Sequence, residues 1–348
     1  LPITASGMII PNAGGTGYYR FSLPEAEWKT MIAGAGTLPP GEALALTDSL
    51  WAGFRAGELP PSLLLDATRA MAANSYSVAA VDGGLRLAGL RQRGLIAGDA
   101  LPGYRRFLTD VYGPRLAAIG FDPATGKLKL VLKRPNPDFP ALDLTDTIEV
   151  AGEAEDPALQ TRLAKAATDW MAGDAKALDQ SYLGAALGAY LAKGGLPAVE
   201  TLFERAASTD DTLFRDSAIG ALASTGKAET GRWLLGKLDD ERLRNPDRLS
   251  ILQYLALEPE TVEMSYAYVT GHYDDLVKNA GLFAAGRLPS LPIRYCSVDK
   301  GAKVERDFRP QVEKHQRGAL SLDRTVEQIH SCGILRDKRG AEILAAFR

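Results

Sequence analysis

The sequence predicts a mainly α-helical fold, a curved solenoid of stacked antiparallel helix pairs preceded by a short β-hairpin. Three observations predict it. Apolar residues recur every three or four positions through most of the chain, as on one face of an amphipathic helix. Turn-forming residues interrupt this pattern at short intervals. A β-prone pattern around a Gly-rich loop marks the first residues instead.

The first 23 residues differ from the rest of the chain. Residues 8–10 and 18–21 are short β-prone runs, and the Gly-rich turn of residues 11–17 separates them. Apolar and aromatic runs on either side of such a loop are typical of a β-hairpin. Because an isolated hairpin is only marginally stable in water, we expect this one to belong to a larger sheet.

The helical pattern begins at Ser22, where Glu25 follows three residues later and Pro24 falls in the first turn, a helix-start signature. Apolar stripes follow at helical spacing. They comprise Leu46, Leu50 and Phe54; Val199, Leu202, Phe203 and Ala206; Phe214, Ala218, Ala221 and Leu222; and Leu322, Val326, Ile329 and Leu335.

Breaks between these stripes occur at residues 173–174, 194–195, 209–211, 225–227 and 245–247. The intervals predict helices of about 10–12 residues, an ordinary globular length. An apolar face on each helix pair can be covered only by neighbouring pairs, which favours a HEAT/armadillo-like solenoid. We find no strict sequence repeat, so this prediction concerns architecture alone.

One stretch, residues 124–150, departs from the helical pattern. Residues 127–133 alternate as in a strand, and Pro135, Pro137 and Pro140 follow closely. Proline at this density interrupts helices and central strands. We therefore expect a surface loop or a small hairpin here.

Composition narrows the classes of partner. The chain has 348 residues, 46% of them hydrophobic and 24% charged, as in a soluble globular protein. Its net charge of −3 gives no reason to expect nucleic acid. No apolar run approaches the roughly 18 residues of a membrane span, and no signal peptide is visible. Because the chain starts at Leu1, we expect an upstream segment to be missing, and the compartment stays open between cytoplasm and export.

The two cysteines, Cys296 and Cys332, are too few for a zinc ribbon or a disulfide framework. The sequence favours two buried free thiols. The alternative is a single disulfide in an exported protein.

No catalytic or metal-binding motif is present. The histidines, His272, His315 and His330, lack the His-Glu-x-x-His spacing that places two imidazoles on one zinc ion. Nucleophile elbows, phosphate loops and dinucleotide fingerprints are absent too, and paired carboxylates are scattered as on any helical surface. We predict no catalytic residue and no metal ligand in this chain.

The candidate binding residues are Arg287 and Arg294, on either side of the Pro-containing loop of residues 288–292. Surface ion pairing is the simpler interpretation. The alternative is that they face a concave groove and bind a carboxylate of a peptide in bidentate fashion.

Residues 10–21 (IPNAGGTGYYRF) resemble the P-N-x-x-G-x-G-Y-Y-R segment of aminopeptidase N-type zinc metallopeptidases, the gluzincins. Residues 41–48 and 56–59 look like that family's first helical hairpin. Residues 295–297 and 304–308, then 318–320, 325–329 and 343–347, are similar to its last helices. The resemblance covers the whole chain, with its motifs in the family's order; residues 124–150 depart from it.

The resemblance implies that residues 1–23 end a truncated β-sandwich domain and that residues 24–348 form the helical C-terminal domain. It implies that the zinc, its ligands and the catalytic base belong to a preceding domain, so this chain has no cofactor of its own. The expected partners are the upstream catalytic and β-sandwich domains and a peptide substrate, whose length and position the helical domain controls by enclosing the active site.

Two other functions remain open. A free-standing helical-repeat scaffold would bind a protein on its concave face, although the N-terminal hairpin argues against it. An unrelated helical enzyme would need a catalytic site outside any motif, such as a pocket that holds a strongly shifted acid.

Overall fold

A computed structural model describes residues 9–125 and 140–348. In these two ranges the chain folds into α-helices and short 3-10 helices, with no strand. The predicted mainly α-helical fold is therefore confirmed. No helix in the described ranges is both long and apolar enough to span a lipid bilayer.

The N-terminal half supplies the first six α-helices and three 3-10 turns. They are η1 (Ala13–Gly15), α1 (Glu25–Ala33), η2 (Ala35–Thr37), α2 (Pro40–Arg55), α3 (Pro61–Met71), α4 (Ser77–Gln92), η3 (Gly98–Ala100), α5 (Leu101–Ile119) and α6 (Pro140–Glu153).

The rest of the chain continues as helices joined by short turns. They are α7 (Pro157–Met171), η4 (Gln180–Tyr182), α8 (Leu183–Ser208), α9 (Thr212–Ala223), α10 (Ala228–Leu235), α11 (Asn245–Leu255), α12 (Val262–Gly271), α13 (Tyr273–Asn279), α14 (Leu282–Ala285), η5 (Leu288–Arg294), α15 (Val298–His315) and α16 (Ala319–Ala345).

Local sequence explains where many of these helices start. Proline occupies the first turn of α2, α3 and α7, where no backbone N–H is needed. Aspartate caps the starts of α7 and α9: the Leu159 N–H donates to Asp156 at 2.8 Å, and the Phe214 N–H donates to Asp211 at 3.1 Å. Each cap satisfies a backbone donor that the helix itself leaves free.

The core has two parts. One joins α1–α5 with the end of α6 and the second half of α16, and it includes Trp28, Phe54 and Tyr104. The other runs from the end of α5 to the first half of α16 and includes Phe203 and Phe308. The predicted stripes lie inside them, since Leu46, Leu50, Phe54, Leu202, Phe214, Ala218, Leu222, Leu322, Ile329 and Leu335 are all buried.

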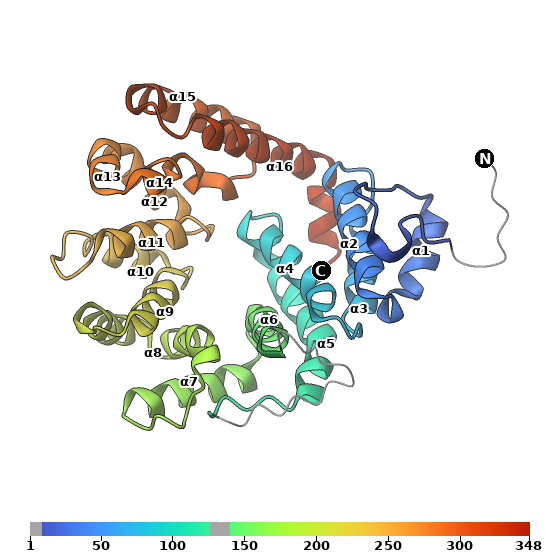
Figure 1. Ribbon diagram of the computed structural model, residues 1–348, viewed down its shortest axis with the longest axis horizontal. Coiled ribbons are helices and arrows are strands. Elements are labelled where there is room, and N and C mark those ends of the chain that lie inside the picture. Colours follow the sequence, from blue (N-terminus) through green and yellow to red (C-terminus); the bar gives the residue numbers. More distant parts are fainter. Residues whose placement is uncertain (1–8, 126–139) are drawn as a thin grey trace.

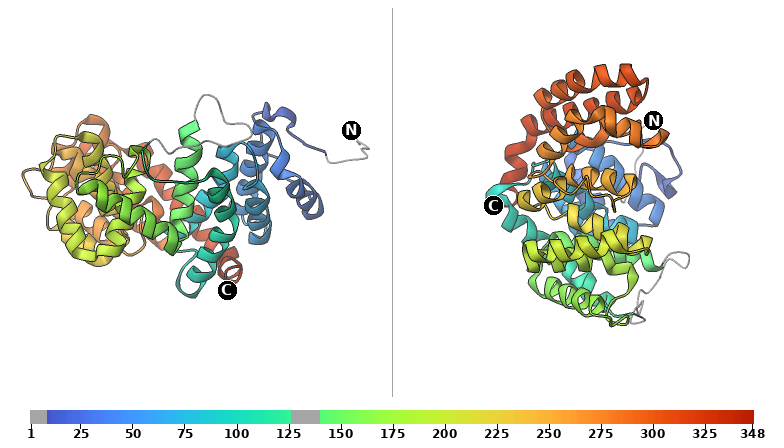
Figure 2. Two further views of the ribbon diagram at one scale, coloured as in Figure 1. Left: turned by 90° about the horizontal axis from the view of Figure 1, so that it is seen from below. Right: turned by 90° about the vertical axis from the view of Figure 1, so that its left-hand side faces the viewer.

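Helices α7–α15 pack mainly on their neighbours along the chain and trace an arc (Figure 1). Figure 2 shows the same arc from two other sides, with the N-terminal helices at the opposite end of the molecule. Helix α4 lies on the inner side of the arc. This arrangement is the curved, solenoid-like stack that the sequence predicts.

The last helix, α16, closes the arc by running from α15 back to α2 and α3. Its C-terminal end is anchored by apolar and polar contacts. The ring of Phe347 meets the edges of Tyr104 and Phe107 at 5.7 and 5.9 Å between centroids. Arg339 donates to the carbonyls of Gly57 at 3.2 Å and Glu58 at 3.3 Å.

The predicted N-terminal β-hairpin is not found in residues 9–23; Met8 lies outside the described ranges. The side chain of Asn12 instead fastens the turn onto itself, accepting from the Gly17 N–H at 2.8 Å and donating to the Gly17 carbonyl at 2.9 Å. The Gly14 N–H donates to Glu42 of α2 at 2.9 Å, and Arg20 pairs with Asp48 at 2.7 Å. The segment therefore follows α2 as an extended strap, because the described residues provide no strand to pair with it.

The prediction of a loop or hairpin over residues 124–150 is wrong from Pro140 onward, where α6 begins. A proline in the first helical turn costs no hydrogen bond, so Pro140 starts a helix rather than breaking one. Residues 127–133, Pro135 and Pro137 lie outside the described ranges.

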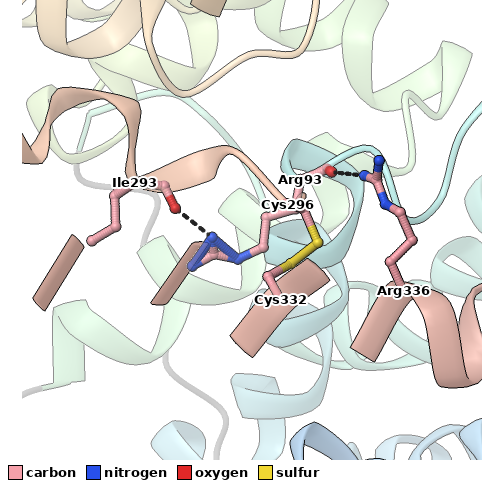
Figure 3. The surroundings of a disulfide bond; sticks show 5 residues. All are labelled: Arg93, Ile293, Cys296, Cys332 and Arg336. Carbon is pink, nitrogen blue, oxygen red and sulfur yellow. Dashed lines mark hydrogen bonds between the residues drawn. A yellow bond between two sulfur atoms is a disulfide. The ribbon is translucent and has the colours of Figure 1, made fainter. Parts of the chain in front are cut away.

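The two cysteines form a disulfide, so the prediction of two free thiols is wrong. Cys296 follows η5 and Cys332 lies in α16; both side chains are buried (Figure 3). Spacing alone did not reveal that α16 returns to the start of α15. The disulfide is the alternative that the sequence left open.

Candidate functional site

The C-terminal end of α4 carries a partly buried ion cluster across the inner side of the arc. Arg91 pairs with Glu153, the last residue of α6, at 2.7 Å and with Glu258, in the turn between α11 and α12, at 2.8 Å. The Tyr104 hydroxyl donates to Glu153 at 3.2 Å. Burial lowers the pKa of Arg91, but the hydrogen bonds to both carboxylates outweigh it and raise that pKa above its ordinary value.

Small residues allow α4 to enter the interior. Gly83 packs against Thr68 of α3, and the Gly84 N–H donates to the Tyr112 hydroxyl at 2.9 Å. A Cβ atom at Gly83 would lie 2.3 Å from the Thr68 hydroxyl, so no larger residue fits without a shift. The helix therefore brings its last turn, with Arg91, into the middle of the molecule.

Next to this ion cluster lies a hollow of about 250 Å³ between α2, α4, the end of η5 and α16. Four arginines line it: Arg55, Arg86, Arg93 and Arg294. We call this hollow the arginine pocket. The rest of its wall is mostly apolar, including Trp51 and Leu335, and α16 adds the polar side chains of Gln328 and Ser331.

The charges of the arginine pocket are only partly compensated. Arg86 pairs with Asp82 at 2.5 Å and lies over the ring of Trp51, 5.1 Å from its centroid. Arg93 donates to the carbonyl of Ile293 at 2.9 Å (Figure 3) and has no carboxylate partner in the described ranges. Burial, then the charges of Arg294 and Arg55, lowers the pKa of Arg93 to about 10, so it remains protonated at neutral pH.

Metal ligation finds no support in the described residues, where no three His, Cys, Asp or Glu side chains converge. The histidines lie apart, and the buried Nε2 of His330 has no hydrogen-bond partner in the described ranges. His272 stacks on Tyr268 at 4.2 Å between centroids, His315 contacts Asp274 at 2.6 Å, and His330 lies beside Gly301.

The model of the ERAP1-like C-terminal domain matches residues 8–331. The chain belongs to this family. A search of curated proteins finds no match. The family is the C-terminal helical domain of M1 aminopeptidases, so the resemblance that the sequence motifs indicated is confirmed.

In this ERAP1-like domain the two predicted binding residues lie at opposite ends of η5. Arg287 precedes its first residue and is exposed, whereas Arg294 is its last residue and half-buried. Only Arg294 lines the arginine pocket. The structure therefore does not bring the two arginines together at one site.

Sequence reasoning missed Arg91, Arg93, Glu153 and Glu258, because their partners lie far apart in the chain. Arg91 and Glu258 are 167 residues apart. One local signal was available: α4 is rich in Ala and Gly, as in a helix buried on most sides, so charges at its end require partners. The composition of α4 therefore predicts a polar cluster at its end, but it does not predict which residues form that cluster.

Proposed function

We propose that this ERAP1-like domain is a non-catalytic part of a zinc aminopeptidase that encloses the active site and positions the peptide. The observation that carries the proposal is the family match over residues 8–331. The arc closed by α16 supports it, because a fixed frame can exclude water and restrict how a peptide lies. Chemistry would come from a zinc-activated water in the catalytic domain.

The partners that we propose are a catalytic domain and a β-sandwich domain of the same polypeptide. Exposed apolar side chains of the N-terminal strap support this. Ile9 is 49% exposed, Tyr19 is 55% exposed, and Tyr18 is fully exposed. Aromatic side chains are enriched at interfaces between proteins. No described residue of this chain is assigned to the zinc.

Enclosure is tested by peptide length in the enzyme that contains the upstream domains. A domain that restricts the substrate chamber makes kcat/KM depend on peptide length, while a single aminoacyl chromogenic substrate is hydrolysed regardless. The comparison is the same enzyme lacking this domain, provided that it remains folded by circular dichroism. Equal length profiles for the two enzymes would rule out enclosure.

Peptide contact by Arg287 or Arg294 stays a prediction. Substituting each by Ala in the enzyme with its upstream domains is expected to raise the KM for peptides, because a guanidinium–carboxylate contact is lost. An unchanged KM for both variants would contradict it.

A further inference from the structure

The arginine pocket holds more positive charge than the chain around it neutralises. Among the described residues, no carboxylate pairs with Arg55, Arg93 or Arg294. Glu258 is the acid that acts on Arg294, but both of its carboxylate oxygens already accept hydrogen bonds from Arg91, at 2.8 and 3.1 Å. The fourth arginine, Arg86, is neutralised by Asp82.

Arg294 has the least satisfied of these guanidinium groups. Its Nε is buried, and no acceptor in the described ranges receives a hydrogen bond from it. Burial lowers the pKa of Arg294; the charge of Glu258 opposes this shift, and the nearby charge of Arg91 adds to it. A buried donor without an acceptor and a half-buried charge without a counter-charge both destabilise a protein unless a ligand completes them.

Contacts along the chain hold Arg93 and the end of η5 in place. Arg93 follows α4, and its Nη1 is fixed on the Ile293 carbonyl, directly before Arg294. Gly89 of α4 leaves space beside Arg294, since even a Cβ there would lie 3.7 Å from Nη1. The Cys296–Cys332 disulfide lies two residues beyond Arg294 and fastens the end of η5 to α16. Arg93, held in this way, loses little freedom when a ligand binds.

We propose that the arginine pocket binds a compact oxyanion of the phosphate type. The guanidinium groups that line the arginine pocket belong to three elements: α2, the C-terminal part of α4 and the end of η5. A carboxylate presents two oxygens in one plane and suits a single bidentate arginine. A phosphoryl group presents oxygens in three dimensions and accepts from several arginines at once. This inference goes beyond the proposed function and does not depend on it.

The test is a titration of the 348-residue chain with inorganic phosphate, followed by calorimetry and by thermal unfolding at constant ionic strength. We expect saturable binding and a matching rise in Tm, because a ligand that binds only the folded state stabilises it. Acetate and chloride at the same ionic strength are expected to give neither. No saturable response to phosphate, or an equal response to acetate, overturns the proposal.

Two variants and a matched control locate the site. Arg294→Gln is expected to weaken phosphate binding at least about ten-fold, the scale of one charge-assisted hydrogen bond. It removes no hydrogen bond within the described ranges, so it is expected to fold. Arg55→Gln, at an exposed position, is expected to weaken binding too. The matched control is Arg287→Gln, on the other side of η5, which is expected to leave phosphate affinity unchanged. Wild-type phosphate affinity in both pocket variants would contradict the assignment of the site to the arginine pocket.

Discussion

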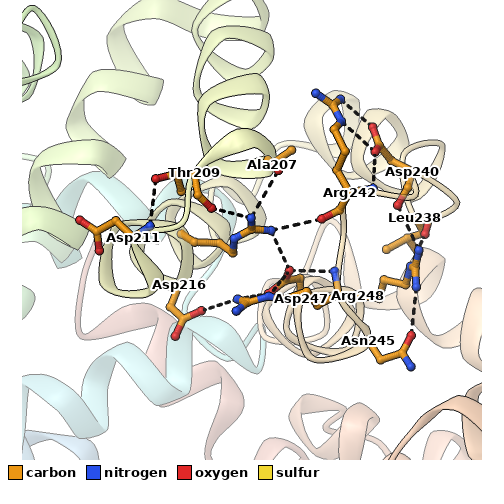
Figure 4. A network of polar contacts seen from close by, with 12 residues as sticks. Ala207, Thr209, Asp211, Asp216, Leu238, Asp240, Arg242, Asn245, Asp247 and Arg248 are labelled. Atoms are coloured by element: carbon orange, nitrogen blue, oxygen red, sulfur yellow. Dashed lines mark hydrogen bonds and ion pairs between the residues drawn. The ribbon is translucent and has the colours of Figure 1, made fainter.

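The pair of Arg215 and Asp247 is the most buried ion pair among the described residues. Asp247 is 2% exposed, and its carboxylate lies 3.2 Å from Arg215 and 2.7 Å from Arg244. Arg215 also donates to the carbonyls of Thr209 at 2.6 Å and Arg242 at 3.2 Å (Figure 4). One guanidinium thus joins the end of α8 to the starts of α9 and α11.

Asp247→Asn is expected to lower the free energy of unfolding by about 3 kcal/mol, because Arg215 keeps a buried charge without its counter-charge. Chemical denaturation measures the change. The matched control is Asp216→Asn, since Asp216 also contacts Arg244, at 3.4 Å, but is 71% exposed. The control is expected to change stability by less than about 0.5 kcal/mol. Equal losses of unfolding free energy in the two variants would show that burial does not determine how much the ion pair stabilises the protein.

The same pair predicts how stability depends on pH. Burial acts to raise the pKa of Asp247, but the hydrogen bonds and charges of Arg244 and Arg215 outweigh it and hold the pKa below its ordinary value. Its contribution is therefore complete above the unfolded-state pKa of about 3.9 and is lost as pH falls through the lower folded-state value. Unfolding curves between neutral pH and acid should fall more steeply for the wild type than for Asp247→Asn. Parallel curves would contradict this.

At the residue scale the sequence could predict which side chains are buried but not which charges meet. The stripe of Leu46, Leu50 and Phe54 was readable because helical spacing places all three on one face. Arg294 was predicted as a binding residue because it lies beside the Pro-containing loop of residues 288–292. Its neighbour Arg93 was not, because the 200 residues between Arg93 and Ile293 leave no local pattern.

At the scale of elements, α8 contains the sharpest break. Gly195 has φ 60° and ψ −151°, a conformation that residues with a Cβ atom avoid, and Pro197 begins the second half of the helix. The predicted break at residues 194–195 thus appears as a kink inside one long helix.

Gly195→Ala is expected to destabilise the protein by about 1–3 kcal/mol, from backbone strain alone, since no atom lies within 4 Å of the added Cβ. Gly188→Ala is the matched control in the same helix: its Cβ would also meet nothing, but its backbone is helical. This control is expected to stabilise by roughly 0.5–1 kcal/mol. Denaturation midpoints of the two variants test the account, and shifts of the same sign would count against it.

The disulfide fixes α16 against the segment that precedes α15. It closes a loop across a sequence separation of 36, for which the chain-entropy model gives about 4 kcal/mol. Cys296→Ala/Cys332→Ala is therefore expected to unfold at lower denaturant concentration, and reductant is expected to destabilise the wild type alone. Two alkylatable thiols in the unreduced, unfolded wild type would show that the bond does not form.

Elements were predictable where local pattern and packing agree. The helix starts at Pro40 and Pro61 follow from proline in the first turn. The helix start at Pro140 was not predicted, because Pro135 and Pro137 close by made the stretch resemble a loop rather than the first turn of a helix. The N-terminal strap was misjudged because β-prone residues form a strand only beside another strand, and the described residues provide none.

At the scale of the whole molecule, the closing of the arc is the feature that sequence could not reveal. Stacking of neighbouring helix pairs follows from apolar stripes, but it leaves the two ends of the arc unplaced. The two ends of the arc are joined by the contact of Phe347 with Tyr104 and by that of Arg339 with Gly57. Each contact joins residues that are more than 200 positions apart in the sequence. Without closure, α2, α4, η5 and α16 would not meet, so the arginine pocket depends on it.

The central claim is that this chain supports catalysis without carrying a catalytic centre. The most direct test is to purify the chain of residues 1–348, determine its zinc content by elemental analysis and assay hydrolysis of aminoacyl chromogenic substrates. We predict no stoichiometric zinc and no turnover, with activity appearing only when the catalytic domain is present on the same polypeptide. One zinc per chain together with turnover that a chelator abolishes would contradict the account.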